Sequence, residues 1–111
     1  MRTQEEIDAK IRELEATAKT FPVVTNAITV LNTYQQLDRR EIRVEIASLG
    51  SRFHAYDKIL TNSEAKPADR SAAKLARLIA MCRASAILWL MGKVDTIVKQ
   101  EKSGATVSLW D

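Results

Sequence analysis

The sequence of 111 residues contains few of the residues that form tight turns, with three glycines and two prolines. An all-β fold needs many tight turns, so this scarcity argues against one. Cys82 is the only cysteine, which excludes an intramolecular disulfide and leaves a reducing cytoplasm as the default compartment. The longest apolar stretch, residues 78–91, has 14 residues and is interrupted by Arg83, whereas a membrane span needs about 20. We therefore expect no transmembrane helix and no membrane partner.

The residues that are present are typical of one globular domain. Hydrophobic residues make up 46% and charged residues 28%, a balance that argues against intrinsic disorder. A chain of this length buries roughly two-thirds of its unfolded surface, so it needs no metal or disulfide to fold. Residues 1–6 lack the apolar core of a signal peptide. We predict a single helical domain over residues 1–111, located in the cytoplasm, with a short flexible tail at residues 103–111.

Four segments carry apolar residues at helical spacing, at residues 3–21, 22–37, 38–60 and 68–102. The first begins with a capping box, in which the side chains of Thr3 and Glu6 each accept from the other's backbone N–H. The third is the clearest, and Gly50 in its middle costs about 1 kcal/mol, too little to break it. The pattern predicts an all-α fold, an antiparallel helical bundle of about four helices with a long C-terminal helix as its spine.

Two of the four segments are less sharply defined. Residues 22–37 are rich in β-branched side chains, so a strand is the alternative to the helix that we prefer. The last segment begins near Ala68 and runs towards Lys102, after which Ser103 and Gly104 supply a stop signal. Gly92 lies inside this segment, where we expect it at most to kink the helix.

The parts of a catalytic or metal site are mostly missing. His54 is the only histidine, and Asp57 one turn later would have to orient it as a base, whereas a histidine bonded to its own helix is the more ordinary role. Cys82 shares an apolar stripe with core-type residues, which predicts a buried small hydrophobe. Glu41 and Glu45 lie one turn apart but among arginines, as in surface ion pairs. We predict a protein that is not an enzyme and has no metal or cofactor.

A basic ridge follows the first turns of the last segment. Five basic residues and no acidic residue lie between positions 70 and 93. The candidate nucleic-acid-binding residues are Arg70, Lys74, Arg77 and Arg83. Such a ridge can neutralise the phosphates of nucleic acid, with a salt dependence that steepens with each contact. The alternative is packing on an acidic helix of the same chain, for which the first segment offers Glu5, Glu6, Glu13 and Glu15.

The second segment offers a polar helix face without charge, because residues 20–37 contain no acidic or basic residue. Charged residues are depleted at the centres of protein interfaces, so such a face suits a contact between subunits. The candidate interface residues on it are Thr29, Asn32, Thr33 and Gln36. The other interpretation is a central helix that its neighbours shield.

The last segment and the tail carry further interface candidates. Small residues at every fourth position let another helix approach closely, namely Ala76, Ala80 and Ala84. Residues 84–91, which include Leu88 and Trp89, are apolar on every side apart from Ser85, and a helix of that kind must be enclosed. Sibling helices or a second subunit can enclose it, and we favour a homodimer. Trp110 is a candidate anchor for a partner, with docking onto its own core as the alternative.

Residues 83–92, with the sequence RASAILWLMG, resemble a segment near the ends of many small helical proteins encoded by phages or prophages. The resemblance implies a bacterial or viral setting and a small protein that binds a larger host or viral machine. It transfers no functional residue. From the residues themselves we predict a non-enzymatic protein-binding or assembly protein that acts through a helical surface as a homo-oligomer. The alternative is a nucleic-acid-binding protein that uses the basic ridge, followed by an enzyme built around His54 and Asp57.

Overall fold

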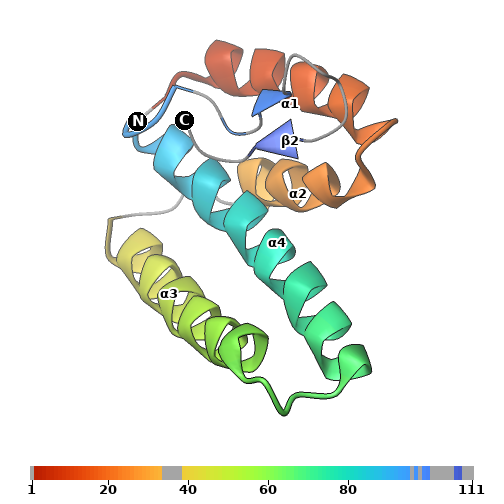
Figure 1. The fold of residues 1–111 in the computed structure, drawn as a ribbon. Helices are drawn as coiled ribbons and strands as arrows, with labels where there is room; N and C mark the ends of the chain where they lie inside the picture. The colour runs from red at the N-terminus through yellow and green to blue at the C-terminus, as the bar shows by residue number, and fades with distance from the viewer. Residues whose placement is uncertain (1, 34–38, 96, 98, 101–106, 109–111) are drawn as a thin grey trace.

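The computed structural model describes residues 2–33, 39–95, 97, 99–100 and 107–108. Its elements are α1 (Gln4–Ala18), the 3-10 turn η1 (Pro22–Val24), α2 (Thr25–Thr33), α3 (Arg39–Thr61) and α4 (Pro67–Leu90), with the short strands β1 (Lys99–Gln100) and β2 (Val107–Ser108). The strands pair antiparallel in a single ladder, with Lys99 opposite Ser108. The described chain is otherwise helical (Figure 1), which confirms the predicted all-α bundle of four helices. Apart from β2, the predicted tail lies outside the described residues.

The beginnings of the first two helices follow from local sequence. Thr3 accepts from the backbone N–H of Glu6 at 3.2 Å, and the Glu6 carboxylate accepts from the backbone N–H of Thr3 at 3.3 Å. The predicted capping box is confirmed. Pro22 begins η1, where its missing N–H costs nothing, and the chain continues into α2 rather than into a strand. Helix formation is thus confirmed through Thr33, and residues 34–37 lie outside the described part of the chain.

Two glycines act on α3 and α4 in different ways. Gly50 lies within α3, which continues through it as expected. Gly92 has a positive φ of 75° directly after α4. Its N–H donates to the carbonyl of Trp89, and the N–H of Lys93 donates to the carbonyl of Leu88, both at 2.9 Å. These two bonds form a Schellman cap, which ends the helix. The prediction that the last helix runs towards Lys102 is therefore wrong, because the glycine ends α4 at Leu90 instead of kinking it.

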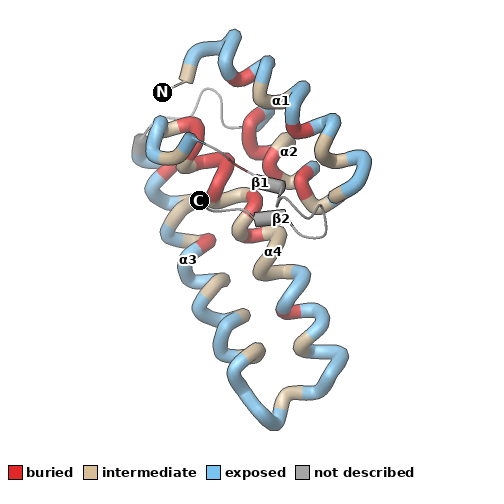
Figure 2. The backbone as a smooth tube through the Cα atoms, turned by 45° about the horizontal axis from the view of Figure 1, so that its top comes forward, coloured by how far each residue is buried: buried red, intermediate tan, exposed pale blue. Residues whose placement is uncertain are grey.

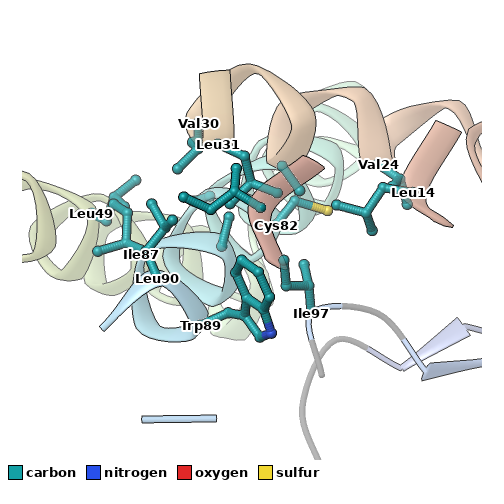
Figure 3. Packing of buried hydrophobic residues seen from close by; sticks show 14 of the residues in the cluster. Leu14, Val24, Val30, Leu31, Leu49, Cys82, Ile87, Trp89, Leu90 and Ile97 are labelled. Atoms are coloured by element: carbon teal, nitrogen blue, oxygen red, sulfur yellow. The ribbon is translucent and has the colours of Figure 1, made fainter. Parts of the chain in front are cut away.

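Helix α4 is the spine of the fold (Figure 1). α3 runs antiparallel along it as the other arm of a hairpin, α2 packs on α4, and α1 packs on η1 and α2. The core forms where these helices meet, and Figure 3 shows its buried members Leu14, Val24, Val30, Leu31, Leu49, Cys82, Ile87, Trp89, Leu90 and Ile97. The predicted burial of Cys82 is confirmed.

The hairpin is covered along only part of its length. Among residues 80–90 of α4 seven are buried, whereas Ala73 is the one buried residue between positions 50 and 79. Figure 2 shows the same contrast, with red segments where α1 and α2 lie and pale blue turns towards the tip of the hairpin. We call residues 50–79 the open half of the hairpin. Here α3 and α4 pack mainly on each other (Figure 1).

Candidate functional site

An apolar stripe on α4 runs out of the core into the open half of the hairpin. Cys82 and Trp89 on this stripe are buried, and Ile79 one turn before Cys82 is half-buried. Leu75, one turn earlier again, is 56% exposed. The spacings of four, three and seven residues place all four side chains on one helix face. The stripe therefore continues beyond its cover, and a large apolar side chain meets solvent where α2 no longer protects it.

Two hollows lie along the open half, each lined by residues of both α3 and α4. The first has a volume of about 420 Å³ and is lined by Tyr56, Ile59, Asn62, Ala65, Asp69, Ala72, Ala73 and Ala76. The second has a volume of about 410 Å³ and is lined by Leu60, Lys74, Arg77, Leu78 and Met81. Both hollows are mainly apolar. Alanines line much of the first, and Leu60, Leu78 and Met81 line the second. The candidate site thus consists of the exposed Leu75 of α4 and of two mainly apolar hollows that residues of α3 and α4 line.

The basic ridge of α4 is largely occupied by partners within the chain. The Nε of Arg77 lies 2.8 Å from Oδ1 of Asp57, and Nη2 of Arg83 lies 3.3 Å from Oε1 of Glu45. Arg70 donates to the backbone carbonyl of Asn62 at 2.6 Å. Of the four predicted nucleic-acid-binding residues, Lys74 alone is classed as exposed. Three cations of the ridge therefore already have an oxygen partner.

The acids that pair with this ridge come from α3 and not from the first helix. The expectation that the basic ridge would pair with the acidic residues of the first helix, Glu5, Glu6, Glu13 and Glu15, is wrong. Glu13 pairs with Lys10 at 3.0 Å and Glu6 with Arg2 at 3.3 Å, both near the N-terminus. The physical reason is the antiparallel hairpin, which places Asp57 and Glu45 beside α4.

The uncharged face of α2 lies on the surface. Thr29, Asn32 and Thr33 are all exposed, so neighbouring helices do not shield them, and Gln36 lies outside the described residues. The Thr29 hydroxyl donates to the carbonyl of Thr25 at 3.0 Å, and the Thr25 hydroxyl donates to the carbonyl of Pro22 at 2.9 Å. Both hydroxyl donors are satisfied inside the helix, so covering this face costs less than burying an unpaired donor.

The remaining interface candidates are divided between the core and the surface. Ala80 and Trp89 are each 3% exposed and belong to the core. Ala76 lines the first hollow, and Ala84 and Leu88 are half-buried. Trp110 lies outside the described residues. The chain encloses residues 84–91 by itself, so this stretch does not require a second subunit.

No local pattern in the sequence predicted that Arg2 completes this enclosure. The Arg2 guanidinium lies 4.6 Å from the centre of the Trp89 ring, and its Nε donates to the Trp89 carbonyl at 2.9 Å. Its Nη2 donates to the carbonyl of Val94, also at 2.9 Å. Lys10 lies over the same ring at 5.4 Å. Arg2 therefore ties the N-terminal segment to the end of α4, and a cation there also interacts favourably with the helix dipole.

The candidates for chemistry in the sequence were Cys82 and the pair of His54 and Asp57. Burial raises the pKa of the Cys82 thiol to about 12, which keeps it protonated and unreactive. His54 is exposed, and the Asp57 carboxylate binds Arg77. Within the described residues, no three His, Cys, Asp or Glu side chains gather where they could hold a metal ion. Over the same residues, no helix has the length and apolar character to cross a membrane.

No family model, curated protein or solved structure matches the chain.

Proposed function

We propose that this chain is a non-enzymatic protein-binding or assembly protein whose binding surface is the open half of the hairpin. The observation that carries the proposal is the 56% exposure of Leu75 on a stripe that continues to the core residues Cys82 and Trp89. An apolar side chain that continues a core stripe, on a helix that also lines two apolar hollows, suits contact with a partner helix. Binding here needs no change in the folded chain.

The electrostatics of the surface favour a protein partner over nucleic acid. The carboxylates of Asp57 and Glu45 offset the charges of Arg77 and Arg83, and Arg70 already donates to a backbone carbonyl, which weakens the attraction of this ridge for phosphate. The lone buried thiol of Cys82 suits a reducing cytoplasm, where we propose that the protein acts. The resemblance of residues 83–92 to phage-encoded proteins favours a bacterial or viral setting and a larger machine as partner.

The test is affinity capture from the native host with three tagged baits, each with and without nuclease. The baits are the wild type, Leu75→Arg and the matched control Val44→Arg. Val44 is 65% exposed on α3 and lies outside the open half, so its substitution adds the same charge elsewhere. We expect the wild type and the control to retain the same nuclease-resistant partners, an untagged copy of the chain among them. Leu75→Arg should lose them. Equal capture by all three baits, or loss of every partner with nuclease, would refute the proposal.

A further inference from the structure

Two helices of the chain carry opposite net charges. α1 has five acidic and two basic residues, for a net charge of −3, and α4 has one acidic and four basic residues, for a net charge of +3. Arg77 and Arg83 of α4 pair with α3 and not with α1. The carboxylates of Asp8 and Glu15 are exposed on α1, and Lys74 is exposed on α4. Lys74 of α4 and the carboxylates of Asp8 and Glu15 of α1 are thus exposed charges of opposite sign that can meet between two molecules.

The outward face of α1 has room for a large side chain. Ile7 and Leu14 face the core, and Ala9 and Ala16 lie on the opposite, exposed side. The two alanines are seven residues apart, so about 10 Å of helix axis separates them. Positions separated by three, four and seven residues on one helix form the hole that receives a side chain of a facing helix. Ala9 and Ala16 are the small ends of such a hole, Arg12 and Glu13 form its sides, and the exposed Asp8 and Glu15 lie next to it on the helix.

The uncharged face of α2 favours a second copy of the chain over an unrelated partner. In Figure 1 α2 lies between α1 and the open half of α4. In a twofold dimer, residues close to the symmetry axis meet their own copies, and like charges there would repel. Thr25, Thr29, Asn32 and Thr33 are exposed without a charge among them, although charged residues make up 28% of the sequence. The uncharged face of α2 can therefore contact the same face of a second copy without repulsion between like charges.

We propose that the open half of the hairpin binds a second copy of this chain, in a twofold dimer in which α1 of each copy lies on α4 of the other. Leu75 of one copy enters the hole between Ala9 and Ala16 of the second copy. Lys74 then faces the acidic flank of that helix, and the α2 faces meet at the axis. The two contacts are identical, so the dimer closes on itself. This inference rests on the proposed function and names its partner.

The first test is the mass of the wild type by sedimentation equilibrium, over a micromolar concentration series at low and high salt. We expect a monomer–dimer equilibrium that weakens as salt rises, because exposed charges are screened. Leu75→Arg should raise the dissociation constant by about ten-fold or more, whereas Val44→Arg should leave it unchanged. A wild type that stays monomeric throughout the series would overturn the inference, as would equal dimerisation of Leu75→Arg.

The second test exchanges the charges between copies. One variant carries Asp8→Lys and Glu15→Lys on α1, and the other carries Lys66→Glu and Lys74→Glu at the beginning of α4, where all four side chains are exposed. Each variant alone brings like charges together and should be monomeric. A mixture pairs opposite charges at both contacts and should restore a one-to-one dimer. Far-UV circular dichroism checks that each variant is folded. Two variants that dimerise alone, or a mixture of folded variants that stays monomeric, would refute this arrangement.

The outcomes separate the inference from the proposed function. If the wild type is monomeric and its capture of another protein depends on Leu75, the second copy is not the partner. The proposed protein-binding surface then still stands. Dimers that form equally well with Leu75→Arg, together with equal capture by all baits, refute both.

Discussion

Gly50 and Gly92 should respond to alanine with opposite signs. The Cβ of an alanine at either position would meet no atom within 4 Å, so neither substitution is opposed by a clash. Gly50 lies inside α3, where alanine is favoured over glycine by about 1 kcal/mol, and we expect Gly50→Ala to stabilise the fold by about that amount. Gly92 has a φ of 75°, which costs an L-residue roughly 1–2 kcal/mol. Gly92→Ala should destabilise the fold by about 1 kcal/mol, because alanine also lowers the entropy of the unfolded chain.

Urea unfolding followed by circular dichroism measures both changes, and thermal unfolding should show shifts of about 4 °C in opposite directions. Gly92→Asn serves as a control, because asparagine tolerates the left-handed region better than alanine and should lose less stability. Gly92→Ala with wild-type stability would refute the left-handed cap and with it the end of α4 at Leu90. Destabilisation by Gly50→Ala would show that α3 is not a regular helix at its centre.

Single side chains provide three more tests. Arg2→Met removes two hydrogen bonds to backbone carbonyls and should cost about 2 kcal/mol in urea unfolding, against less than about 0.5 kcal/mol for the exposed control Arg12→Met. Equal losses would contradict the tie between the N-terminal segment and α4. Cys82 should resist thiol reagents until the protein unfolds. Because burial raises its pKa in the folded state from 9.0 to about 12, its contribution to stability should be complete below pH 9.0 and decline above it, and rapid labelling of the native protein would contradict this. Thr3→Ala should cost about 1 kcal/mol. The backbone and hydroxyl hydrogen bonds of Thr3 lower the pKa of Glu6 below 4.5, so stability should fall as the pH drops through that region, and an equally steep fall in the variant would contradict the capping box.

Features fixed by neighbouring residues could be predicted from the sequence. The capping box needs only Thr3 and Glu6 at their spacing, and α3 needs only its apolar positions at intervals of three and four. The burial of Cys82 follows from its place on an apolar stripe. The same stripe contains Leu75, but helical spacing alone cannot show how far along α4 the cover of α2 extends. The exposure of Leu75 therefore depends on how the helices pack and could not be predicted from helical spacing.

The predictions from the sequence that were wrong or missing concern contacts between residues far apart in the chain, and one backbone conformation. The acids that pair with Arg77 and Arg83 depend on which helix lies beside α4, and both α1 and α3 contain acidic residues that could pair with them. Arg2 reaches Trp89 across 87 positions of the chain, with no local pattern to signal it. The end of α4 had a local signal in Gly92. Apolar residues continue after that glycine at spacings that suit a helix, so a kink and a cap were both compatible with the sequence.

The uneven cover of α4 also has a consequence for how the protein unfolds. Local opening requires less free energy where few apolar contacts must be broken. The turns of α4 before Ile79 contact mainly α3, whereas those from Ala80 to Leu90 are surrounded by core residues. One continuous helix should thus belong to two cooperative units. Its first half should exchange amide hydrogens through partial opening, and its second half only when the whole molecule unfolds.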